Sequence, residues 1–393
     1  MLGFIGSSLS LLILFAASAA PIPLYEQFAQ SLDLTKGDLA MTSVMYFAGT
    51  IIALVFFARI SNYIGRKKAI YLTLVLGILG CVAFIFAHSE ILIMLGRFIQ
   101  GIASGLASST IMAFILDNEP KKFPNLGVAI TSSGPNLGLI IGAVITGIVV
   151  AFLANDSLFI FELLIATLFI CLIMIFYSQE TITPQSGLLK SFIPKIKLPP
   201  KVKPLLLPAA CTSFASWSFG GFYQSYSATI AMQIFHLNDT FIASLVFISF
   251  IGPIAFGAMV AKNYDDFKAQ LYGMSLYLLS FLALYLSLFS QNLSFYLAIN
   301  IIAGFFSGLM FAGSLKTILS IITLNERADV LSAIYIISYG GAAIPNLIIS
   351  QIAYLFDLTQ LIFSYLILAI IAYIILLLCR QKLNMAFYRQ QIN

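Results

Sequence analysis

The sequence predicts an all-α integral membrane protein with twelve transmembrane helices in two six-helix repeats. Three observations lead to this fold class. Of the 393 residues, 61% are hydrophobic and only 9% are charged, and the mean hydropathy is +1.02. The apolar residues form twelve long runs, each near the roughly 20 residues that a helix needs to cross a bilayer. Short motifs also recur in the same order in the two halves of the chain.

This composition excludes several other classes of protein. A soluble domain carries about 25% charged residues, so a soluble enzyme of this length could not cover its surface. Aromatic residues make up 14% of the chain, which is the opposite of a disordered composition. Continuous rather than alternating apolar runs exclude an outer-membrane barrel. The four cysteines lie far apart inside apolar runs, so we expect no disulfide framework, metal or cofactor.

The twelve predicted spans follow one another with short loops. They cover residues 4–24, 39–58, 69–87, 91–115, 126–153, 157–178, 205–232, 240–261, 269–289, 293–315, 329–355 and 359–379. The longest interruption, rich in Lys, Pro and Ser, separates six spans from six. We therefore expect an N-terminal six-helix bundle, a cytoplasmic linker, a C-terminal six-helix bundle and a cytoplasmic tail, over residues 1–180, 181–204, 205–380 and 381–393 respectively.

The first span resembles a signal peptide in its Leu-rich stretch and in the small residues that end it. A signal peptide begins with a positively charged region, whereas Met1 to Ala20 contain neither Lys nor Arg. We therefore expect this span to be retained as a helix.

Positive charges predict the orientation in the membrane. Lys36 stands alone on one side, and Arg97 lies within a span. The other eighteen cations all fall on the opposite side: Arg59, Arg66, Lys67, Lys68, Lys121, Lys122, Lys190, Lys195, Lys197, Lys201, Lys203, Lys262, Lys268, Lys316, Arg327, Arg380, Lys382 and Arg389. The positive-inside rule makes this side cytoplasmic, so both termini are expected in the cytoplasm.

The two halves of the chain repeat each other. Residues 99–106 in span 4 match residues 302–309 in span 10 at an offset of 203 residues. Three further matches follow the same order at offsets of 201 to 210, namely Gly49 with Gly252, Asn62-Tyr63 with Asn263-Tyr264, and Pro135-Asn136-Leu137 with Pro345-Asn346-Leu347. Two parallel six-helix repeats are typical of transporters that bind their substrate near the bilayer midplane.

Three motifs resemble signatures of the major facilitator superfamily. Ala58–Lys67 is similar to the loop signature Gly-x-x-x-Asp-Arg-x-Gly-Arg-Arg/Lys, with its Gly-Arg-Lys end intact. Ile93–Gly101 contains the Arg-x-x-Gln-Gly core of the span 4 motif, and Gly134–Leu139 resembles the antiporter motif Gly-Pro-x-x-Gly-Gly without its last Gly. The resemblance implies the superfamily fold, and the third motif points toward its twelve-span drug:proton antiporter branch.

The span 4 motif supplies the first candidates for transport and coupling. Arg97 lies about 9 Å inside the outer end of its span, and an ionisable residue at such a depth is a functional hypothesis by default. Gln100 is one turn away on the same face. Asn300 occupies the repeat-equivalent position in span 10. A role of Arg97 in substrate or proton coupling and a structural hydrogen-bonding role both remain open.

Carboxylates within the spans are scarce. Glu26, at the outer end of span 1, and Glu162, near the outer end of span 6, are the candidates for carrying a proton. In the superfamily, span 1 lines the cavity and span 6 is peripheral, so the resemblance favours Glu26.

The substrate cavity is expected where spans 1, 4, 7 and 10 meet, as the resemblance implies. Span 7 is unusually polar and aromatic for a segment that faces lipid. Its candidates, together with a serine of span 4, are Ser104, Trp217, Tyr223, Gln224 and Tyr226. An interfacial aromatic belt is the alternative for the two tyrosines.

A second group of candidates concerns gating and helix packing. Gly65 permits a tight turn, and the cations after it, Arg66 and Lys67, can pair with Asp117 or Glu119 across a cytoplasmic gate. A run of small residues every four positions lines one face of span 5, and a Gly-Pro pair in span 8 is its expected counterpart. The resemblance places this face between the two halves: Gly134, Pro135, Gly138, Gly142, Gly252 and Pro253.

The leading functional hypothesis is a proton-coupled exporter of small, partly apolar molecules. The alternative is a proton-coupled uptake symporter for a sugar, organic acid or amino acid, and a transport-dead membrane sensor is more remote. An enzyme is not expected, because no nucleophile, metal or ATP-binding constellation is present in the sequence. The expected partners are the substrate, protons and membrane lipid, with no nucleic acid, for a monomer in a bacterial-type inner membrane.

Overall fold

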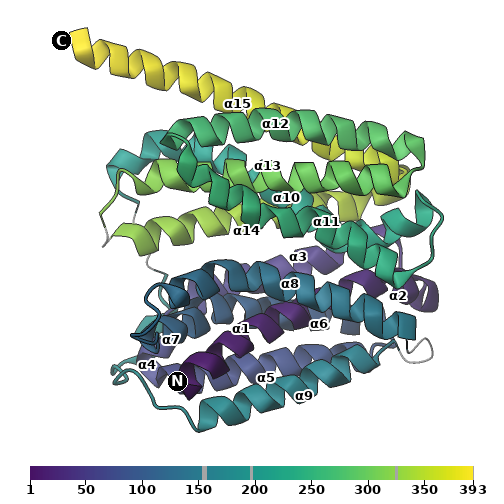
Figure 1. Cartoon of the computed structure of the whole chain (residues 1–393), viewed down its shortest axis with the longest axis vertical. Helices are drawn as coiled ribbons and strands as arrows, with labels where there is room; N and C mark the ends of the chain where they lie inside the picture. The colour runs from purple at the N-terminus through teal and green to yellow at the C-terminus, as the bar shows by residue number, and fades with distance from the viewer. Residues whose placement is uncertain (153–156, 195–197, 324–325, 393) are drawn as a thin grey trace. The chain divides into compact units, whose positions relative to one another are not determined.

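The structure is a computed structural model that describes residues 1–152, 157–194, 198–323 and 326–392, and their ordered elements are all helices. The N-terminal half contains α1 (Leu2–Ala19), η1 (Ile22–Leu24), α2 (Tyr25–Leu32), α3 (Lys36–Ile52), η2 (Ala53–Phe57), α4 (Ile60–Ile64), α5 (Arg66–Ile85), α6 (Glu90–Leu106), η3 (Ala107–Ile111), α7 (Met112–Asp117), α8 (Leu126–Phe152) and α9 (Phe159–Phe176) (Figure 1).

The rest of the chain begins with two short turns, η4 (Leu188–Phe192) and η5 (Pro200–Val202). Its helices are α10 (Lys203–Gln233), α11 (Thr240–Val260), η6 (Ala261–Asn263), α12 (Asp266–Ser287), η7 (Leu288–Ser290), α13 (Leu293–Leu319), α14 (Arg327–Ile352), η9 (Ala353–Leu355) and α15 (Leu358–Ile392).

The helices confirm the predicted fold class. Within the described residues, eleven helices are long and apolar enough to cross a membrane. They match every predicted span except the seventh. Helix α10 covers that segment with 31 residues, but its serines, glycines and tyrosines lower its hydropathy. The seventh span is therefore present as a long helix that is more polar than its neighbours.

Proline modifies the first span. Helix α1 ends at Ala19, and Pro21 and Pro23 lie in the turn that leads through η1 into α2. Proline lacks the backbone N–H that would continue a helical ladder. The apolar segment therefore runs on to Leu32 as two helices joined by a turn.

The chain divides into two compact units. Unit 1 contains Met1–Pro194 and Phe222–Ile248, and unit 2 contains Lys195–Gly221 and Ser249–Asn393. Helix α10 therefore changes unit after Gly221, and α11 changes unit after Ile248. Phe222–Ile248 is called the outer segment below, because it contains the predicted outer parts of spans 7 and 8 and the loop between them. The sequence-based domain boundaries at 180, 204 and 380 stay a prediction.

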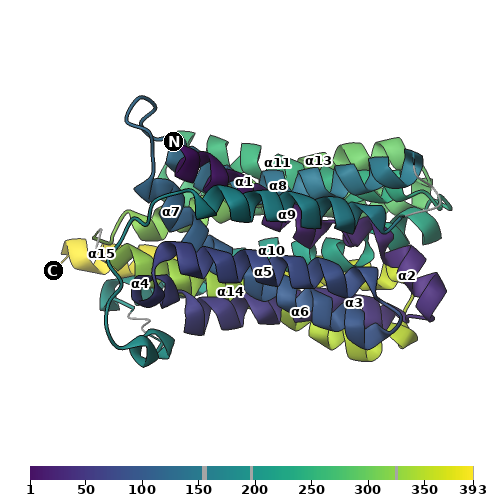
Figure 2. The same ribbon diagram turned by 90° about the horizontal axis from the view of Figure 1, so that it is seen from below.

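Unit 1 is organised around α1, which packs against α8 and α9, while α3 and α5 pack against α6. The short helices α4 and α7 lie at one end of the unit and α2 at the other (Figures 1 and 2). Gly3 approaches Asn118 and Ser178, so the N-terminus lies at the α4–α7 end. That end carries the loop cations of the predicted cytoplasmic side.

The internal repeat is visible in how helices approach each other within each unit. Small residues allow close backbone contact where lipid supplies no hydrophobic drive. Two glycines of α6 lie on backbone atoms of α3, and the two repeat-equivalent glycines of α13 lie on backbone atoms of α11: Gly101 on Tyr46, Gly105 on Thr50, Gly304 on Phe250 and Gly308 on Ile254. The offset of 203 residues seen in the sequence thus corresponds to equivalent helix contacts.

In unit 2, α12 packs against α13 and α15. An ion pair between Lys201 Nζ and Glu326 Oε2, 2.9 Å apart, joins the segment before α10 to the start of α14. The Thr323 backbone N–H, together with Lys201, lowers the pKa of Glu326 to about 2. Two cations of the predicted linker, Lys195 and Lys197, lie outside the described residues.

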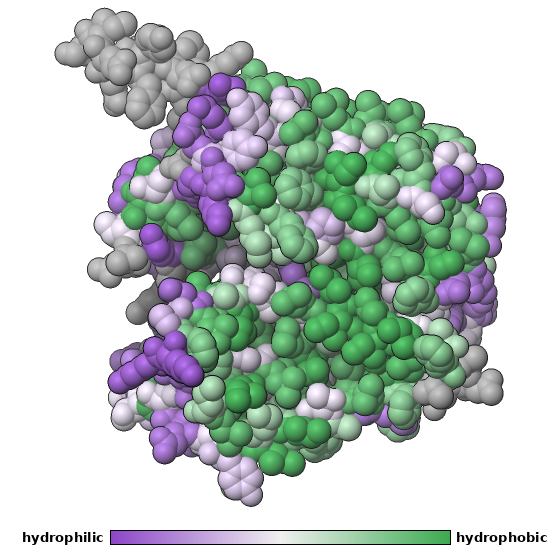
Figure 3. Space-filling view, viewed as in Figure 1, coloured by the Kyte–Doolittle hydropathy of each residue, from purple (hydrophilic) through white to green (hydrophobic). Residues whose placement is uncertain are grey.

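The molecular surface agrees with a membrane location. On the face shown in Figure 3, apolar side chains cover the middle of the helices and hydrophilic ones gather toward their ends. Helix α9 illustrates this, because Phe169, Ile170 and Ile173 are all more than half exposed. Exposed apolar side chains in such numbers are expected where lipid replaces water.

Candidate substrate and coupling site

Arg97 lies at the centre of a polar cluster inside unit 1. Its side chain is completely buried. Nη1 donates to the Ser18 carbonyl oxygen at 2.6 Å and to Gln100 Oε1 at 3.1 Å, and Nε donates to the Thr42 carbonyl oxygen at 3.4 Å. Nη2 donates to Gln224 Oε1 at 2.9 Å. One guanidinium therefore contacts α1, α3, α6 and α10.

Gln100 and Ser104 extend the cluster along α6. The Gln100 amide donates from Nε2 to the Ala17 carbonyl oxygen at 2.8 Å. The hydroxyls of Ser18 and Ser104 lie 2.9 Å apart. Both α6 side chains are buried, so α1 and α6 are joined by hydrogen bonds in an otherwise apolar interior.

Unit 2 also contains a buried serine pair, without a cation beside it. The hydroxyls of Ser216 and Ser307 lie 2.8 Å apart, and Ser307 is the repeat equivalent of Ser104. Asn300, the equivalent of Arg97, is buried and donates from Nδ2 to Ser249 Oγ at 2.7 Å. Asn300 therefore belongs to unit 2, whereas Arg97 belongs to unit 1.

The outer segment supplies three of the predicted cavity residues to unit 1. Tyr223, Gln224 and Tyr226 are all buried. The Tyr226 hydroxyl donates to the Lys36 carbonyl oxygen at 2.6 Å, which ties α10 to the start of α3. Because these tyrosines are enclosed and one of them holds a neighbouring helix, the interfacial aromatic belt does not describe them.

Three further residues complete the surroundings of Arg97 and were not predicted. The Tyr46 ring lies 4.5 Å from the guanidinium carbon in a cation–π contact. Tyr25 is fully buried close to Arg97 and Thr42. Thr42 accepts through its backbone carbonyl, which carries no signature in a sequence. Of the three, Tyr46 offered a signal, because it lies inside span 2 at a depth similar to that of Arg97.

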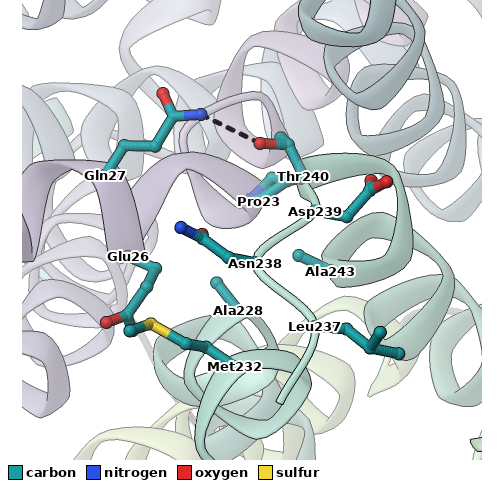
Figure 4. Close-up of a pocket in the computed structure, with 10 residues that line it drawn as sticks. All are labelled: Pro23, Glu26, Gln27, Ala228, Met232, Leu237, Asn238, Asp239, Thr240 and Ala243. Atoms are coloured by element: carbon teal, nitrogen blue, oxygen red, sulfur yellow. Dashed lines mark hydrogen bonds between the residues drawn. The ribbon is translucent and has the colours of Figure 1, made fainter. Parts of the chain in front are cut away.

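Glu26 lies in a small pocket at the α2 end of unit 1, shown in Figure 4. Its lining comes from η1, α2 and the outer segment, and includes Asn238, Asp239 and Met232. Gln27 Nε2 donates to Thr240 Oγ1 at 3.0 Å across this region. Glu26 is half-buried. A carboxylate here faces a segment that belongs to the second half of the sequence.

Glu162 is not brought to this cluster. It lies in the first turn of α9, and its side chain is exposed. This exposure agrees with the peripheral position that the resemblance implies for span 6, and a role of Glu162 as proton carrier stays a prediction.

Trp217 belongs to an aromatic group in unit 2. Its ring makes edge contacts with Tyr339, at a centroid distance of 4.9 Å, and with Phe311, at 5.8 Å. The indole is half-buried. It can offer a ring face for stacking, but it is not part of the Arg97 cluster.

The turn between α4 and α5 is built around Gly65 and an acid that the sequence analysis missed. Gly65 has φ +96°, a conformation that favours glycine. Glu180 accepts from the backbone N–H groups of Arg66 at 3.0 Å and Lys67 at 3.1 Å, and so caps the start of α5. An acid just after span 6 was the available signal.

Of the two acids predicted to pair with the cations of this turn, Asp117 forms an ion pair and Glu119 binds a backbone N–H group. Arg66 Nε lies 3.2 Å from Asp117 Oδ2. Glu119 instead accepts from the Gly127 backbone N–H at 2.7 Å, at the start of α8. Lys67 Nζ donates to the carbonyl oxygens of Phe176 and Ser178. All these contacts lie within unit 1, so the Arg66–Asp117 pair does not by itself join two halves.

The small-residue face of α8 has a different packing partner from the one predicted. Gly134, Gly138 and Gly142 pack against α1 of the same unit and not between the halves. A Cβ at Gly138 would lie 2.5 Å from the Leu12 carbonyl oxygen, and one at Gly142 would collide with Ala16. The stripe showed correctly that a helix approaches closely, but small residues do not specify which helix. Pro135 lies inside α8 on this stretch.

Gly252 and Pro253 lie inside α11 and are half-buried. They follow closely after Ile248, the last residue of the outer segment. Their predicted role as the counterpart of the α8 face stays a prediction.

Comparison with known proteins identifies the family. Residues 7–346 match the Major Facilitator Superfamily, and since this covers most of the chain, the protein belongs to that superfamily. The fold agrees with two crystal structures of a bacterial homologue of the human lysosomal transporter Spinster. One, inward-facing and occupied, has a TM-score of 0.72 and 15% identity over 96% of both chains. The other, inward-facing and unoccupied, has a TM-score of 0.70 and 12% identity over the same share.

Curated relatives match over shorter stretches. Sugar transporter ERD6-like 2 of Arabidopsis thaliana is 34% identical over 102 residues, which are 26% of this chain and 22% of that protein. The uridine/deoxyuridine transporter of Lactococcus lactis subsp. cremoris (strain MG1363) is 28% identical over 102 residues, 26% of this chain and 21% of that protein. The matched stretch thus spans about a fifth of either relative.

Proposed function

We propose that this protein is a secondary active transporter that carries a small hydrophilic molecule across the membrane by alternating access. The observation that carries this proposal is the buried cluster of Arg97, Gln100, Ser104 and Gln224 in unit 1. Polar groups are expensive inside a membrane protein and are retained where they serve a pathway. Hydrogen-bonding groups at this depth suit a solute rich in hydroxyl or amide groups.

We place uptake ahead of export. The curated relatives that match part of this chain transport a sugar or uridine, which supports a hydrophilic solute. Proton-coupled export of partly apolar molecules is the second candidate. Its support is the motif Gly-Pro-x-x-Gly at Gly134–Gly138, whose glycines pack on α1.

Alternating access is proposed to move the outer segment. In this structure the outer segment is hydrogen-bonded to α6 through Gln224, to α3 through Tyr226 and to α2 through Thr240. Helices α10 and α11 therefore close the outer end of unit 1. Opening would break these bonds. Gly220-Gly221 in α10 and Gly252-Pro253 in α11 lie beside the points where the two helices change unit, and such pairs permit a helix to bend.

Proton coupling is proposed to use Glu26. This carboxylate is half-buried beneath the outer segment. Displacement of that segment would expose Glu26 to the outer solution and its pH. Proton exchange between Glu26 and the outer solution would then accompany opening.

Transport by purified protein in proteoliposomes tests the proposal. Radiolabelled glucose, uridine and gluconate would be compared with ethidium, a partly apolar cation, under an imposed proton gradient. We expect at least one hydrophilic solute to accumulate on the side toward which protons flow. Accumulation of ethidium against the proton flow, without movement of any of the hydrophilic solutes, would favour the exporter instead.

The orientation is proposed to place both termini in the cytoplasm of a cell with a bacterial-type inner membrane. Fusions of alkaline phosphatase and of green fluorescent protein to the C-terminus test it. Fluorescence without phosphatase activity is expected, and phosphatase activity alone would reverse the proposed topology.

A further inference from the structure

Arg97 is a buried cation without a counter-ion. Among the residues that the structure describes, it is the only fully buried charged side chain, and the ion pairs found there do not include it. Its acceptors are two backbone carbonyls and two side-chain amides, all neutral. Enclosing a cation without a paired anion is costly. A protein that retains such a charge has a use for it.

A second buried donor lies beside the guanidinium. Tyr25 is completely buried close to Arg97, and its hydroxyl has Thr42 as a close polar neighbour. No hydrogen bond of full geometry forms between this hydroxyl and the described residues, whereas buried polar groups are usually hydrogen-bonded. The cation and the hydroxyl together form a donor set that can bind a further acceptor.

Gln224 occupies the place where that acceptor would bind. Its amide oxygen takes a hydrogen bond from Arg97 Nη2 at 2.9 Å. Gln224 belongs to the outer segment, which is proposed to leave when the outer side opens. Departure would remove the amide oxygen from Nη2 and expose the guanidinium together with Tyr25.

We propose that Arg97 and Tyr25 bind an anionic group of the transported molecule, so that the substrate is a small hydrophilic carboxylate or phosphate. This inference rests on the proposed function, and it names the substrate class of the same site. Arginine binds carboxylate and phosphate oxygens with two parallel N–H donors. Ser18, Gln100 and Ser104 lie beside the guanidinium and suit a hydroxylated body.

The test uses matched pairs of anionic and neutral compounds. Purified full-length protein is unfolded by heat while its fluorescence is followed, since a ligand that binds the folded state raises the midpoint. The pairs are gluconate with glucose, glucose 6-phosphate with glucose, and uridine 5′-monophosphate with uridine, at equal ionic strength. We expect the anionic member of at least one pair to raise the midpoint in a saturable way, beyond its neutral partner.

Two variants connect this shift to the site. Arg97→Gln should weaken the apparent affinity for the anion at least tenfold, whereas Arg380→Gln, the same change at an exposed position of α15, should leave it unchanged. Gln224→Glu places a carboxylate beside Arg97. This variant should have a higher unfolding midpoint without ligand, and its affinity for the anion should be at least tenfold weaker. It therefore tests anion binding even if Arg97→Gln does not fold.

Two results would overturn the assignment. One is that no anionic compound shifts the wild-type midpoint beyond its neutral partner. The other is that an anion's affinity is the same in the wild type and in Gln224→Glu. Uptake of glucose or uridine into proteoliposomes, with no effect of any anion, would leave the transport proposal standing and remove this one. If an anion specifically raises the midpoint but no solute is transported, binding of an anion at Arg97 would stand and the transport proposal would be removed.

Discussion

At the scale of the residue, Arg97 combines two tasks that its sequence position alone could not separate. Its guanidinium joins four helices through neutral acceptors, which is a structural role. It also keeps an uncompensated charge in the interior, which a structural role does not require. The planar fork of arginine matters for both, because its donors point in several directions at once.

Arg97→Lys should fold but transport poorly. A lysine ammonium is a single point that cannot reach the carbonyls of Ser18 and Thr42 and also Gln224. Hydrogen bonds to charged groups contribute about 1.5–3 kcal/mol each, so we expect uptake to fall tenfold or more at equal protein in the membrane. Initial rates in proteoliposomes measure this. Wild-type rates in the lysine variant would show that only the charge matters.

Glu26 and Glu162 provide a matched pair of carboxylates. Glu26 lies in the pocket beneath the outer segment, and Glu162 is exposed on α9. Glu26→Gln should remove the stimulation of uptake by a proton gradient, while downhill exchange of solute continues. Glu162→Gln should behave like the wild type. Gradient-driven and exchange rates distinguish the two, and retained stimulation in Glu26→Gln would exclude it as the proton carrier.

Residue-level prediction worked for side chains whose type is unusual for their depth. Arg97, Gln100 and Gln224 were candidates because charged or amide groups are rare inside spans, and the structure brings all three together. Ser18 and Thr42 contribute backbone carbonyls, which every residue possesses, so no sequence pattern could select them. Trp217 and Glu162 were selected for their chemistry, but the packing places them elsewhere.

At the scale of the element, hydropathy located the helices well because each span must be apolar over a bilayer's thickness. Loops were harder to interpret. Glu180 caps α5 from the far side of span 6, and its role depends on how the chain returns to the turn at Gly65. The sequence likewise did not show which helix covers the face of Gly134, Gly138 and Gly142, and the structure places α1 there.

Gly142→Ala should destabilise unit 1. A Cβ at this position collides with backbone atoms of Ala16, and overpacking of this kind costs about 1–3 kcal/mol. Gly220→Ala is the control, because no described residue outside its own stretch of helix lies within 4 Å of an added Cβ and alanine has the higher helix propensity. Thermal unfolding in detergent should show a lower midpoint for Gly142→Ala alone. Equal midpoints would contradict the close contact of α1 and α8.

At the scale of the whole molecule, the two repeats share a plan but differ in charge. Equivalent glycine contacts occur in both units, and each unit contains a buried serine pair. Arg97 in the first unit corresponds to Asn300 in the second, so the buried cation belongs to one repeat only. The sequence predicted the duplication from its offset. It could not predict that the outer segment packs with the first unit, because that depends on the conformation that the chain adopts.

The most direct test of the central claim is to hold the outer segment in place. Gln27→Cys and Thr240→Cys, in a background without the native cysteines, would be joined by a short bis-methanethiosulfonate cross-linker across the bond between α2 and α11. The control pair is Ser275→Cys and Tyr373→Cys, at a hydrogen bond between α12 and α15 within unit 2. We expect cross-linking of the first pair to stop solute uptake and reduction to restore it, with the control pair active throughout. Full uptake by the cross-linked first pair would contradict alternating access through the outer segment.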